Sequence, residues 1–283
     1  MPELPEIEAI RKYLGLSLSN QTITKVKTFQ HTAIRNLPIK DFEDRLYLTT
    51  LDKIERIGKI LKFTFYKGEI IQHLYLDHGL TGRLAWLTSK KLPTKTVFLM
   101  MFKGGKILIY HDSRLHGAIW LFTCENNESC GFPPKINDFG PDILQISEED
   151  FHNRLQRFNG EIKGILTNQK FVSGIGNAYA DEILFEAAIH PFDKRPQLSK
   201  EEISKLYHAC NRILSDSTNK IYAILCETEK LDNEKNWREH IFKIHLKGKQ
   251  PCPVCGNLIS TIKARKFTNF CRKCQNPRNR SFF

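Results

Sequence analysis

The sequence has no long apolar segment. Its longest uninterrupted apolar run is Val97 to Phe102, far short of the roughly 20 residues that a membrane-spanning helix needs. The first residues also lack the basic stretch and apolar core of a secretory leader. We therefore expect a soluble, intracellular protein without a membrane partner. Neither low-complexity tracts nor internal repeats occur, and a hydrophobic content of 41% over 283 residues indicates folded domains.

Acidic residues are missing from one end of the chain. From His240 to Phe283 there are ten Lys or Arg and no Asp or Glu. The formal net charge is +12, so this end supplies +10 and all other residues supply the remaining +2. A cationic segment favours a polyanion, because each neutralised phosphate releases counterions. We expect nucleic acid as the partner; a merely solvated charged face is the alternative.

The same segment holds four of the eight cysteines, in the pattern C-x2-C, fifteen residues, C-x2-C. This spacing is typical of one tetrahedral zinc site. The ligands are Cys252, Cys255, Cys271 and Cys274, and one structural Zn2+ is expected because four thiolates leave no open position for a catalytic water. Disulfides or scattered core thiols are the alternative. The other cysteines show no second pair and are expected to be free buried thiols: Cys124, Cys130, Cys210 and Cys226.

Hydrophobic periodicity divides the rest of the chain into two halves. A short helix is expected where Ile7, Ile10 and Leu14 recur behind Pro5. Alternating runs then predict strands of a β-sandwich or barrel, at Thr22 to Phe29, Ile60 to Phe65, Ile70 to Leu76, Val97 to Phe102 and Ile107 to Tyr110, the last two joined as a hairpin across Gly104 and Gly105. Beyond a Gly/Pro-containing break at residues 131–141, capping boxes at Ser147-x-x-Asp150 and Ser199-x-x-Glu202 predict helices.

A glycine-containing loop, Val172 to Tyr179, lies between helical segments. Gly174 and Gly176 let a backbone approach a ligand closely, and the N-terminus of the following helix offers N–H groups to an anion. Asn177 adds a side-chain donor. The loop fits a DNA phosphate, although a Gly-x-Gly before a helix is often only a tight turn.

The first residues can carry chemistry. Removal of Met1 leaves Pro2 with a secondary amine, which ionises well below a lysine and is a better nucleophile near pH 7. Its attack on a sugar C1′ would form an iminium directly, and Glu3 beside it is suited to proton transfer. The alternative is that Pro2 and Glu3 only begin a helix, whose positive end favours acids.

Together, the Pro-Glu-Leu-Pro-Glu start, the Gly-Ile-Gly-Asn loop and the terminal cysteine hairpin resemble the formamidopyrimidine-DNA glycosylase and endonuclease VIII family. Leu4, where the endonuclease VIII branch usually has glycine, makes the chain more similar to the formamidopyrimidine branch. The resemblance implies an α+β multidomain fold: an N-terminal β-sandwich preceded by a helix (1–135), a helical helix-two-turn-helix domain (136–235) and a C-terminal β-hairpin zinc finger (240–283). It also implies a monomer that acts on damaged double-stranded DNA in the bacterial cytoplasm or nucleoid.

The resemblance assigns roles to individual residues. Pro2 is implied as the Schiff-base nucleophile, Glu3 as the general acid and base, and Glu6 as a supporting carboxylate. Lys59 matches a catalytic-site lysine that contacts phosphate near the lesion. The implied DNA-binding residues are Leu80 as the wedge that fills the emptied duplex, Arg114 as reader of the opposite base, His116 at a stacking position, Lys163 at the lesion pocket, Asn177 at a phosphate and Lys266 in the zinc hairpin.

Several of these positions depart from the family's pattern. Asp77 replaces a phosphate-contacting histidine, and an acid repels phosphate; His78 is the candidate to take over the contact. His116 replaces a stacking phenylalanine, and Lys266 replaces an arginine and loses its bidentate fork. The loop that would cover a flipped base, within Thr218 to Arg238, resembles nothing assignable.

These observations predict a bifunctional DNA glycosylase and abasic-site lyase of base-excision repair. It would excise oxidised purines such as 8-oxoguanine or formamidopyrimidines through an N-terminal proline Schiff base and β,δ-elimination. Two alternatives stay open at this stage. One is the same chemistry on oxidised pyrimidines or cross-linked bases, and the other is a non-catalytic, zinc-dependent DNA-binding relative.

Overall fold

The computed structural model describes all residues except 90, 125–129, 264–266 and 279–283. The chain forms two compact units. The first, here called the N-terminal unit, comprises Met1–Asn137 and Ile221–Lys235, and the second, the C-terminal unit, comprises Asp138–Lys220 and Asn236–Phe283. No helix among the described residues is both long and apolar enough to cross a membrane.

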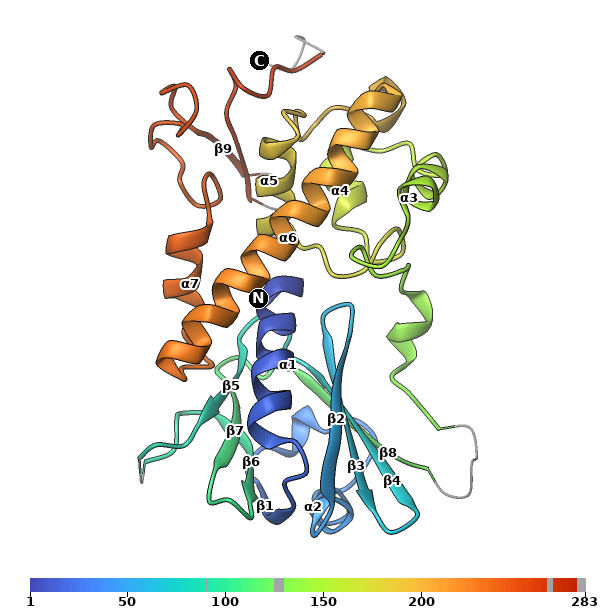
Figure 1. Ribbon diagram of the computed structural model, residues 1–283, viewed down its shortest axis with the longest axis vertical. Coiled ribbons are helices and arrows are strands. Elements are labelled where there is room, and N and C mark those ends of the chain that lie inside the picture. Colours follow the sequence, from blue (N-terminus) through green and yellow to red (C-terminus); the bar gives the residue numbers. More distant parts are fainter. Residues whose placement is uncertain (90, 125–129, 264–266, 279–283) are drawn as a thin grey trace. The chain divides into compact units, whose positions relative to one another are not determined.

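The N-terminal unit contains two four-stranded antiparallel sheets (Figure 1). One has the order β1-β6-β7-β5 and the other β2-β3-β4-β8. Their bounds are β1 Ile23–Thr28, β2 Thr50–Ile57, β3 Ile60–Lys67, β4 Ile70–Asp77, β5 Gly82–Trp86, β6 Thr96–Phe102, β7 Ile107–Asp112 and β8 Ala118–Cys124, with helices α1 Leu4–Leu18 and α2 Ile39–Leu46 and a 3-10 turn at His31–Ala33. All five expected strands are confirmed, as is the hairpin of β6 and β7.

Helix α1 forms where the sequence predicts it. Glu3 has an extended N-cap backbone, and Pro5 lies in the first turn, where its missing N–H costs no intrahelical hydrogen bond. Ile7, Ile10 and Leu14 are buried, because their spacing places them on one face of the helix. This face packs α1 against β2 and β3, so the start of the chain is held on the sandwich.

The C-terminal unit is built mainly of helices. The helices that follow the sandwich are α3 Glu148–Leu155, α4 Ile162–Leu166, α5 Asn177–Glu186, α6 Lys200–Thr228 and α7 Glu234–Ile241, with 3-10 turns at Pro134–Asp138 and Arg195–Gln197 and a hairpin of β9 Ser260–Lys263 and β10 Phe267–Phe270. The expected capping box at Ser199 is complete: Glu202 Oε2 accepts a hydrogen bond from Ser199 N at 2.8 Å, and Ser199 Oγ accepts one from Glu202 N at 3.3 Å. At Ser147 the N-cap forms, since Ser147 Oγ accepts a hydrogen bond from Asp150 N at 3.1 Å, but the Asp150 carboxylate accepts from the Ser147 hydroxyl in place of the backbone N–H. The residues of α6 are shared, with Ile221–Thr228 in the N-terminal unit.

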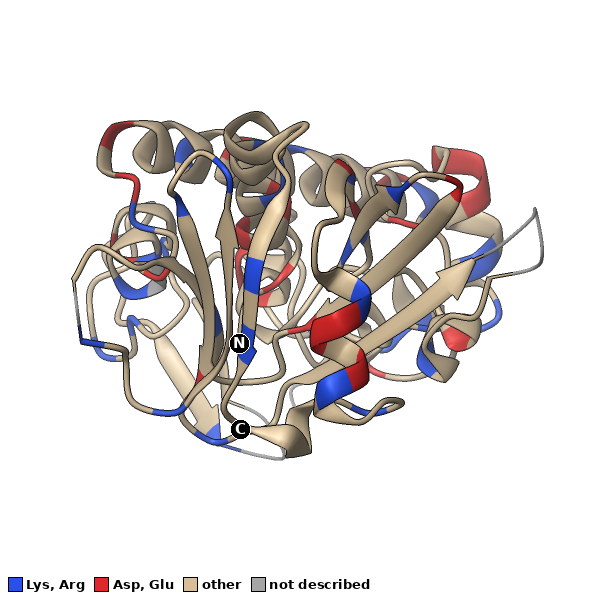
Figure 2. Ribbon diagram, turned by 90° about the horizontal axis from the view of Figure 1, so that it is seen from below, with Lys and Arg blue, Asp and Glu red and all other residues tan. Residues whose placement is uncertain are grey.

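This architecture confirms the expected fold class. The strands are largely uncharged and both signs of charge occur on the helices (Figure 2), which is the pattern of sheets whose side chains fill a core. The largest buried aromatic residues of the N-terminal unit include Phe42, Phe98 and Tyr110. The ring centroids of Phe42 and Phe98 lie 6.0 Å apart, and those of Phe98 and Tyr110 lie 5.7 Å apart.

One expectation about the cysteines is wrong. Cys124 and Cys130, expected to be free buried thiols, form a disulfide with their Cα atoms 5.3 Å apart. Cys124 ends β8, and Cys130 lies beside it although six positions separate the two in sequence. Without a C-x2-C pattern, the spacing carried no signal for this approach. Cys226 is a free but exposed thiol, so only Cys210 is both free and buried as expected.

Candidate active site and DNA-binding residues

The start of the chain forms a buried carboxylate pair at the N-terminus of α1. Glu3 is 3% exposed and Glu6 is fully buried. Glu6 Oε2 accepts a hydrogen bond from the Glu3 backbone N–H at 2.9 Å, which fixes the peptide directly after Pro2. Pro2 is itself buried. The structure therefore brings the predicted acid and its supporting carboxylate together beside the predicted nucleophile.

An ion-pair cluster connects α1 with the hairpin that carries Lys59. Glu8 on α1 pairs with Arg56 at 3.0 Å and with Arg11 at 2.6 Å. Arg56 Nη1 also donates to the Gly58 carbonyl at 3.0 Å, so it braces the turn between β2 and β3 in which Lys59 lies. Burial opposes ionisation of Glu8, but the hydrogen bond from Arg11 and the charge of Arg56 outweigh it and lower the pKa of this carboxyl.

Asp112 joins the two loops that carry the candidate DNA-reading residues. Its Oδ1 accepts hydrogen bonds from the Thr81 hydroxyl and from Arg114 N, and its Oδ2 accepts one from Gly117 N at 2.7 Å. Burial would raise the pKa of Asp112, but these hydrogen bonds, led by Thr81, lower it. Asp112 ends β7 and is fully buried. The sequence pattern did not predict this role, and its only signal was the position of Asp112 two residues before Arg114.

The side chains predicted to touch DNA project from these joined loops. Leu80 is 46% exposed, and Arg114 and His116 are exposed. The loops are in close contact, since a Cβ on Gly79 would lie 2.7 Å from the His116 carbonyl oxygen. Gly79 also has a φ of +56°, a conformation that glycine adopts without strain. The structure therefore gathers the predicted wedge and base reader into one surface.

His78 does not replace the missing phosphate-contacting histidine. It is 2% exposed, and neither ring nitrogen has a hydrogen-bond partner among the described residues. Its ring packs edge-on to Tyr110 at 6.0 Å. Burial, with the charge of Arg83 next, lowers the pKa of His78 to about 3. The positive charge of the amino terminus acts in the same direction.

Asp77 is neutralised within the protein. Its Oδ2 pairs with Lys135 Nζ, and its Oδ1 accepts a hydrogen bond from Gly79 N at 3.0 Å. Burial, with the charge of Arg35 next, lowers the pKa of Lys135 to about 8, which leaves the ammonium largely protonated at pH 7. Asp77 therefore holds the backbone of residues 78–81, the loop that carries Leu80 and is here called the wedge loop. Lys135 offsets the repulsion that the Asp77 carboxylate would exert on a DNA phosphate.

In the C-terminal unit, the glycine-containing loop is fastened from within. Gln169 Oε1 accepts a hydrogen bond from Gly174 N at 3.0 Å, and Gln169 Nε2 donates to the Ile175 carbonyl at 2.8 Å. Gly174 has a φ of +107°. Helix α5 begins directly after this loop at Asn177. Asn177 Nδ2 donates to the Phe267 carbonyl at 2.9 Å, so in this structure the amide binds the zinc hairpin.

Lys163 is held by protein groups. It is 6% exposed and pairs with Asp181 Oδ1 at 2.6 Å. It also donates to the Phe267 carbonyl at 2.9 Å and to Thr268 Oγ1 at 3.0 Å. Asp181 Oδ2 lies 2.7 Å from His245 Nδ1. Lys163 and Asp181 therefore join α4 and α5 to strand β10, a link that the sequence pattern did not reveal.

The four cysteines of the C-terminal hairpin converge as predicted. Their sulfur atoms all lie within 4.8 Å of one another, with Cys252 and Cys274 Sγ 3.8 Å apart and Cys255 and Cys271 Sγ 3.4 Å apart. Tetrahedral Zn–S bonds of about 2.3 Å place sulfur atoms about 3.8 Å apart, so the cluster fits zinc. A tight turn with Gly256 at a φ of +74° shapes the first pair.

Buried contacts fix the zinc hairpin to α5. Glu182 accepts hydrogen bonds from the backbone N–H groups of residues 243, 244 and 245 at 2.9, 3.0 and 2.8 Å. Burial raises the pKa of this carboxyl, and the three hydrogen bonds oppose the rise. Phe185 packs with Ile244 and with the ligands Cys252 and Cys271. Lys266, predicted to bind DNA from this hairpin, lies outside the described residues.

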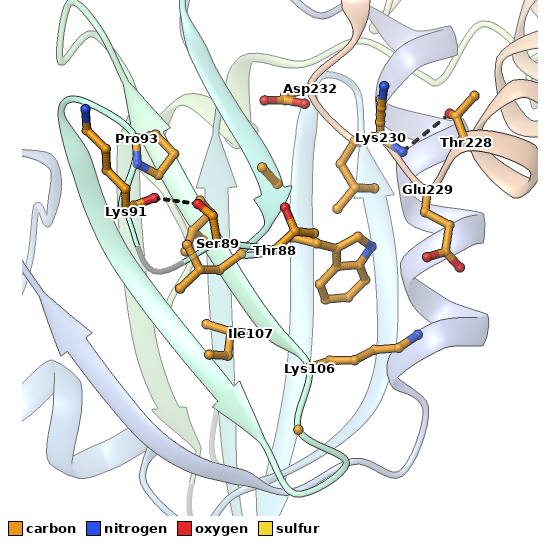
Figure 3. A pocket seen from close by; sticks show the side chains of 16 residues that line it. Thr88, Ser89, Lys91, Pro93, Lys106, Ile107, Thr228, Glu229, Lys230 and Asp232 are labelled. Carbon is orange, nitrogen blue, oxygen red and sulfur yellow. Dashed lines mark hydrogen bonds between the residues drawn. The ribbon is translucent and has the colours of Figure 1, made fainter.

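Residues 218–238, within which a loop covering the flipped base is expected, are helical at both ends. Helix α6 continues to Thr228 and α7 begins at Glu234. Residues 228–232 line a cavity of about 600 Å3, together with β5, the loop after it and the β6–β7 turn (Figure 3). Lys106 Nζ lies 5.3 Å from the centroid of the Trp86 ring there. Among the described lining residues, none is one predicted for catalysis or DNA binding.

Comparisons with known proteins agree with this geometry. Family models described as the formamidopyrimidine-DNA glycosylase N-terminal domain, the formamidopyrimidine-DNA glycosylase H2TH domain and the zinc finger found in FPG and IleRS match residues 1–119, 139–224 and 249–277. A formamidopyrimidine-DNA glycosylase from Mycoplasma mobile is 31% identical over 277 residues, covering 97% of this chain and 99% of the relative. The chain belongs to the formamidopyrimidine-DNA glycosylase family. It is therefore a DNA glycosylase of base-excision repair with one structural zinc ion.

Other members of the formamidopyrimidine-DNA glycosylase family give the same result. The enzyme from Desulfitobacterium hafniense is 30% identical over 279 residues, covering 97% of this chain and all of the relative. A Lactococcus lactis FPG mutant in complex with a Fapy-dG containing DNA has a TM-score of 0.83 at 25% identity. A complex of Lactococcus lactis Fpg with an abasic site containing DNA has a TM-score of 0.80 at 26% identity. Both cover 98% of this chain and all of theirs.

The buried ring of His78 predicts a specific loss of stability in acid. Between its ordinary pKa of 6.5 and the lowered value of about 3, the unfolded chain binds a proton here that the folded chain does not. The free energy of unfolding therefore falls as pH falls, by up to about 1.4 kcal/mol per pH unit. From pH 6 to pH 4.5, urea denaturation should show wild type losing up to about 2 kcal/mol more than His78→Phe.

His116→Phe is the matched control, because this ring is exposed on the neighbouring loop and its replacement should leave the acid loss unchanged. An equal loss in wild type and His78→Phe would contradict the assignment.

The ion pair of Lys163 predicts that the zinc hairpin depends on α4. Lys163→Met leaves the Asp181 carboxylate, 1% exposed, without its ammonium partner. Removing one member of a buried pair costs roughly 3–5 kcal/mol. We expect a lower melting temperature and faster zinc release to a colorimetric chelator.

Lys170→Met is the control, because its ion pair with Asp138 has both side chains about two-thirds exposed and should cost less than about 1 kcal/mol. Equal effects of the two substitutions would refute the structural role of Lys163.

Proposed function

We propose that this chain excises oxidised purines, such as 8-oxoguanine and formamidopyrimidines, from double-stranded DNA and then cleaves the resulting abasic site. The observation that carries the proposal is the buried Glu3 and Glu6 pair beside Pro2. The names of the relatives support the purine substrate class, as does the Fapy-dG containing DNA bound to the Lactococcus lactis protein. Because the proposed substrate is the DNA of the cell, the enzyme would act inside the cell.

Pro2 is the proposed nucleophile once Met1 is removed. Its secondary amine attacks C1′ of the damaged nucleotide, so the bond from nitrogen to C1′ forms as the bond from C1′ to the base breaks. The amine loses its proton, and protonation of the ring oxygen O4′ breaks the C1′–O4′ bond, which opens the sugar and gives an iminium. The iminium withdraws electrons and acidifies the C2′ hydrogen. Loss of that proton expels the 3′ phosphate by β-elimination, and a second proton loss expels the 5′ phosphate by δ-elimination. Hydrolysis frees the sugar remnant from Pro2 and leaves a one-nucleotide gap.

Glu3 is the proposed general acid and base. It lies at the N-cap of α1, where the helix dipole favours a carboxylate. In this role it protonates the sugar ring oxygen during base loss and then accepts protons during elimination. Glu6 supports it by holding the Glu3 backbone N–H, which fixes the distance between acid and amine. Lys59, on the turn braced by Arg56, is proposed to hold the phosphate near the lesion.

The remaining residues are proposed to grip and bend the duplex. Leu80 fills the space of the flipped nucleotide as an apolar wedge, and Arg114 reads the opposite base with His116 stacked beside it. Asn177 and the N–H groups that begin α5 bind a phosphate. For that contact Asn177 exchanges its hydrogen bond to the Phe267 carbonyl. Lys163 serves as a positioning residue, and Lys266 supplies a cation to the DNA backbone.

One other substrate class remains a candidate. The same chemistry on oxidised pyrimidines or cross-linked bases is favoured by one observation, the exposed His116 where the family commonly has phenylalanine. A non-catalytic DNA-binding relative, the other alternative from the sequence, does not fit membership of a glycosylase family. Substrate preference separates the two remaining candidates.

The deciding experiment is borohydride trapping on duplexes that carry 8-oxoguanine, an oxidised pyrimidine or an abasic site. Protein with a mature N-terminus should form a covalent adduct that maps to Pro2, with 8-oxoguanine preferred over the pyrimidine. An N-terminal extension that blocks Pro2 should abolish the adduct. It should leave DNA affinity within about threefold of that of wild type, because binding of the duplex does not use the free amine. Glu3→Gln should slow base release by roughly 10²-fold or more.

Pro5→Ala is the matched control, since it changes a proline of the same turn without touching the amine, and it should trap as well as wild type. Equal trapping by the blocked protein would sink the assignment of Pro2. Base release without any adduct would contradict the proposed Schiff base and lyase step.

A further inference from the structure

Three potential metal ligands lie together on the sheet β2-β3-β4-β8, outside the zinc hairpin. Strands β4 and β8 pair in antiparallel register, with Ile71 opposite Cys124 and His73 opposite Phe122. His73 and Cys124 are therefore diagonal neighbours on the same face of the sheet. Cys130 lies beside Cys124. One ring nitrogen of His73 and the two sulfur atoms all lie within 4.8 Å of one another.

The surroundings hold these side chains in place. His73 Nδ1 lies 3.2 Å from Thr64 Oγ1 on β3, and its ring lies 6.4 Å from that of Tyr75. Cys124 is 7% exposed, and His73 and Cys130 are half-buried. The chain after Cys130 is packed tightly, because a Cβ on Gly131 would lie 2.4 Å from the Phe122 ring.

We propose that Cys124, Cys130 and His73 form a second, redox-gated site for a thiophilic cation such as Zn2+. In the oxidised state the two sulfur atoms bond to each other and the site is closed. A dithiol reductant opens it: the S–S bond breaks, two electrons and two protons pass to Cys124 and Cys130, and the reductant becomes a disulfide. Binding of Zn2+ then releases both thiol protons to solvent, and the metal takes two thiolates and one imidazole.

The imidazole of His73 is the reason to infer a metal site rather than a disulfide alone. A disulfide needs no third group, whereas two thiolates and an imidazole are the donor set that zinc prefers. The Thr64 hydroxyl engages Nδ1, as outer partners do at zinc sites, and Nε2 is the nitrogen proposed to bind the metal. Three protein ligands leave the fourth position to water or an external thiol.

This site is independent of the proposed function. Its residues belong to the N-terminal unit, whereas the four-cysteine cluster belongs to the C-terminal unit. None of the three residues is among those proposed for catalysis or DNA binding. Loss of the site therefore leaves base excision untouched, and failure of either proposal does not affect the other.

The test is a zinc titration of the full-length protein in its reduced and its mildly oxidised form, with the four-cysteine site already loaded. Alkylation and mass spectrometry verify the state of Cys124 and Cys130 in each sample. Reduced wild type should bind a second equivalent of Zn2+ in competition with a chelating dye, and the oxidised protein should not. Co2+ in its place should give the absorption of a tetrahedral, thiolate-bound ion.

Variants locate the second equivalent. The double substitution Cys124→Ser, Cys130→Ser should remove it, and His73→Gln should weaken it by on the order of tenfold or more. Cys210→Ser, Cys226→Ser is the matched control with two thiols removed elsewhere, and it should retain the second equivalent. The proposal is overturned if reduced wild type binds only one equivalent, or if the second persists in Cys124→Ser, Cys130→Ser.

Discussion

The C-terminal unit depends on two adjacent buried carboxylates of α5. Asp181 pairs with Lys163 and contacts His245, and Glu182 accepts three backbone hydrogen bonds from residues 243–245. A charge withdrawn from water is costly unless it is paired and hydrogen-bonded. Both carboxylates meet this requirement only when α4, α5 and the zinc hairpin are assembled together. The metal therefore organises its own hairpin, and the carboxylates decide where that hairpin lies on the unit.

In the N-terminal unit, two further carboxylates each join separate segments of the chain. Glu8 joins α1 to the Lys59 turn through Arg56, and Asp112 joins the loops of Leu80 and Arg114 through the Thr81 hydroxyl and two backbone N–H groups. In each case a carboxylate is satisfied by groups from two separate segments, so the segments keep a fixed relation. Residues proposed to act on DNA are thus positioned by buried or partly buried acids.

Charge at the wedge loop shows why residue type alone is a weak guide. From the sequence, Asp77 is expected to repel phosphate, and His78 beside it is expected to make the phosphate contact instead. In the folded unit Lys135 neutralises Asp77, while His78 is buried against Tyr110. The electrostatic character of the loop therefore depends on a lysine 58 positions further along the sequence, which no local pattern connects to it.

The sequence by itself determined the features that rest on local spacing. These are the cysteine cluster, the helix that begins after Glu3, five strands of the sandwich, the N-caps at Ser147 and Ser199 and, through its motifs, the family. Domain boundaries and the roles of single residues stay predictions. Only the tertiary structure decided the pairing of Cys124 with Cys130, the burial of His78 and the partners of Asp112, Asp181 and Lys163. Periodicity and spacing report which face a residue occupies on its own element, whereas these contacts join residues from different elements and exist only when those elements pack.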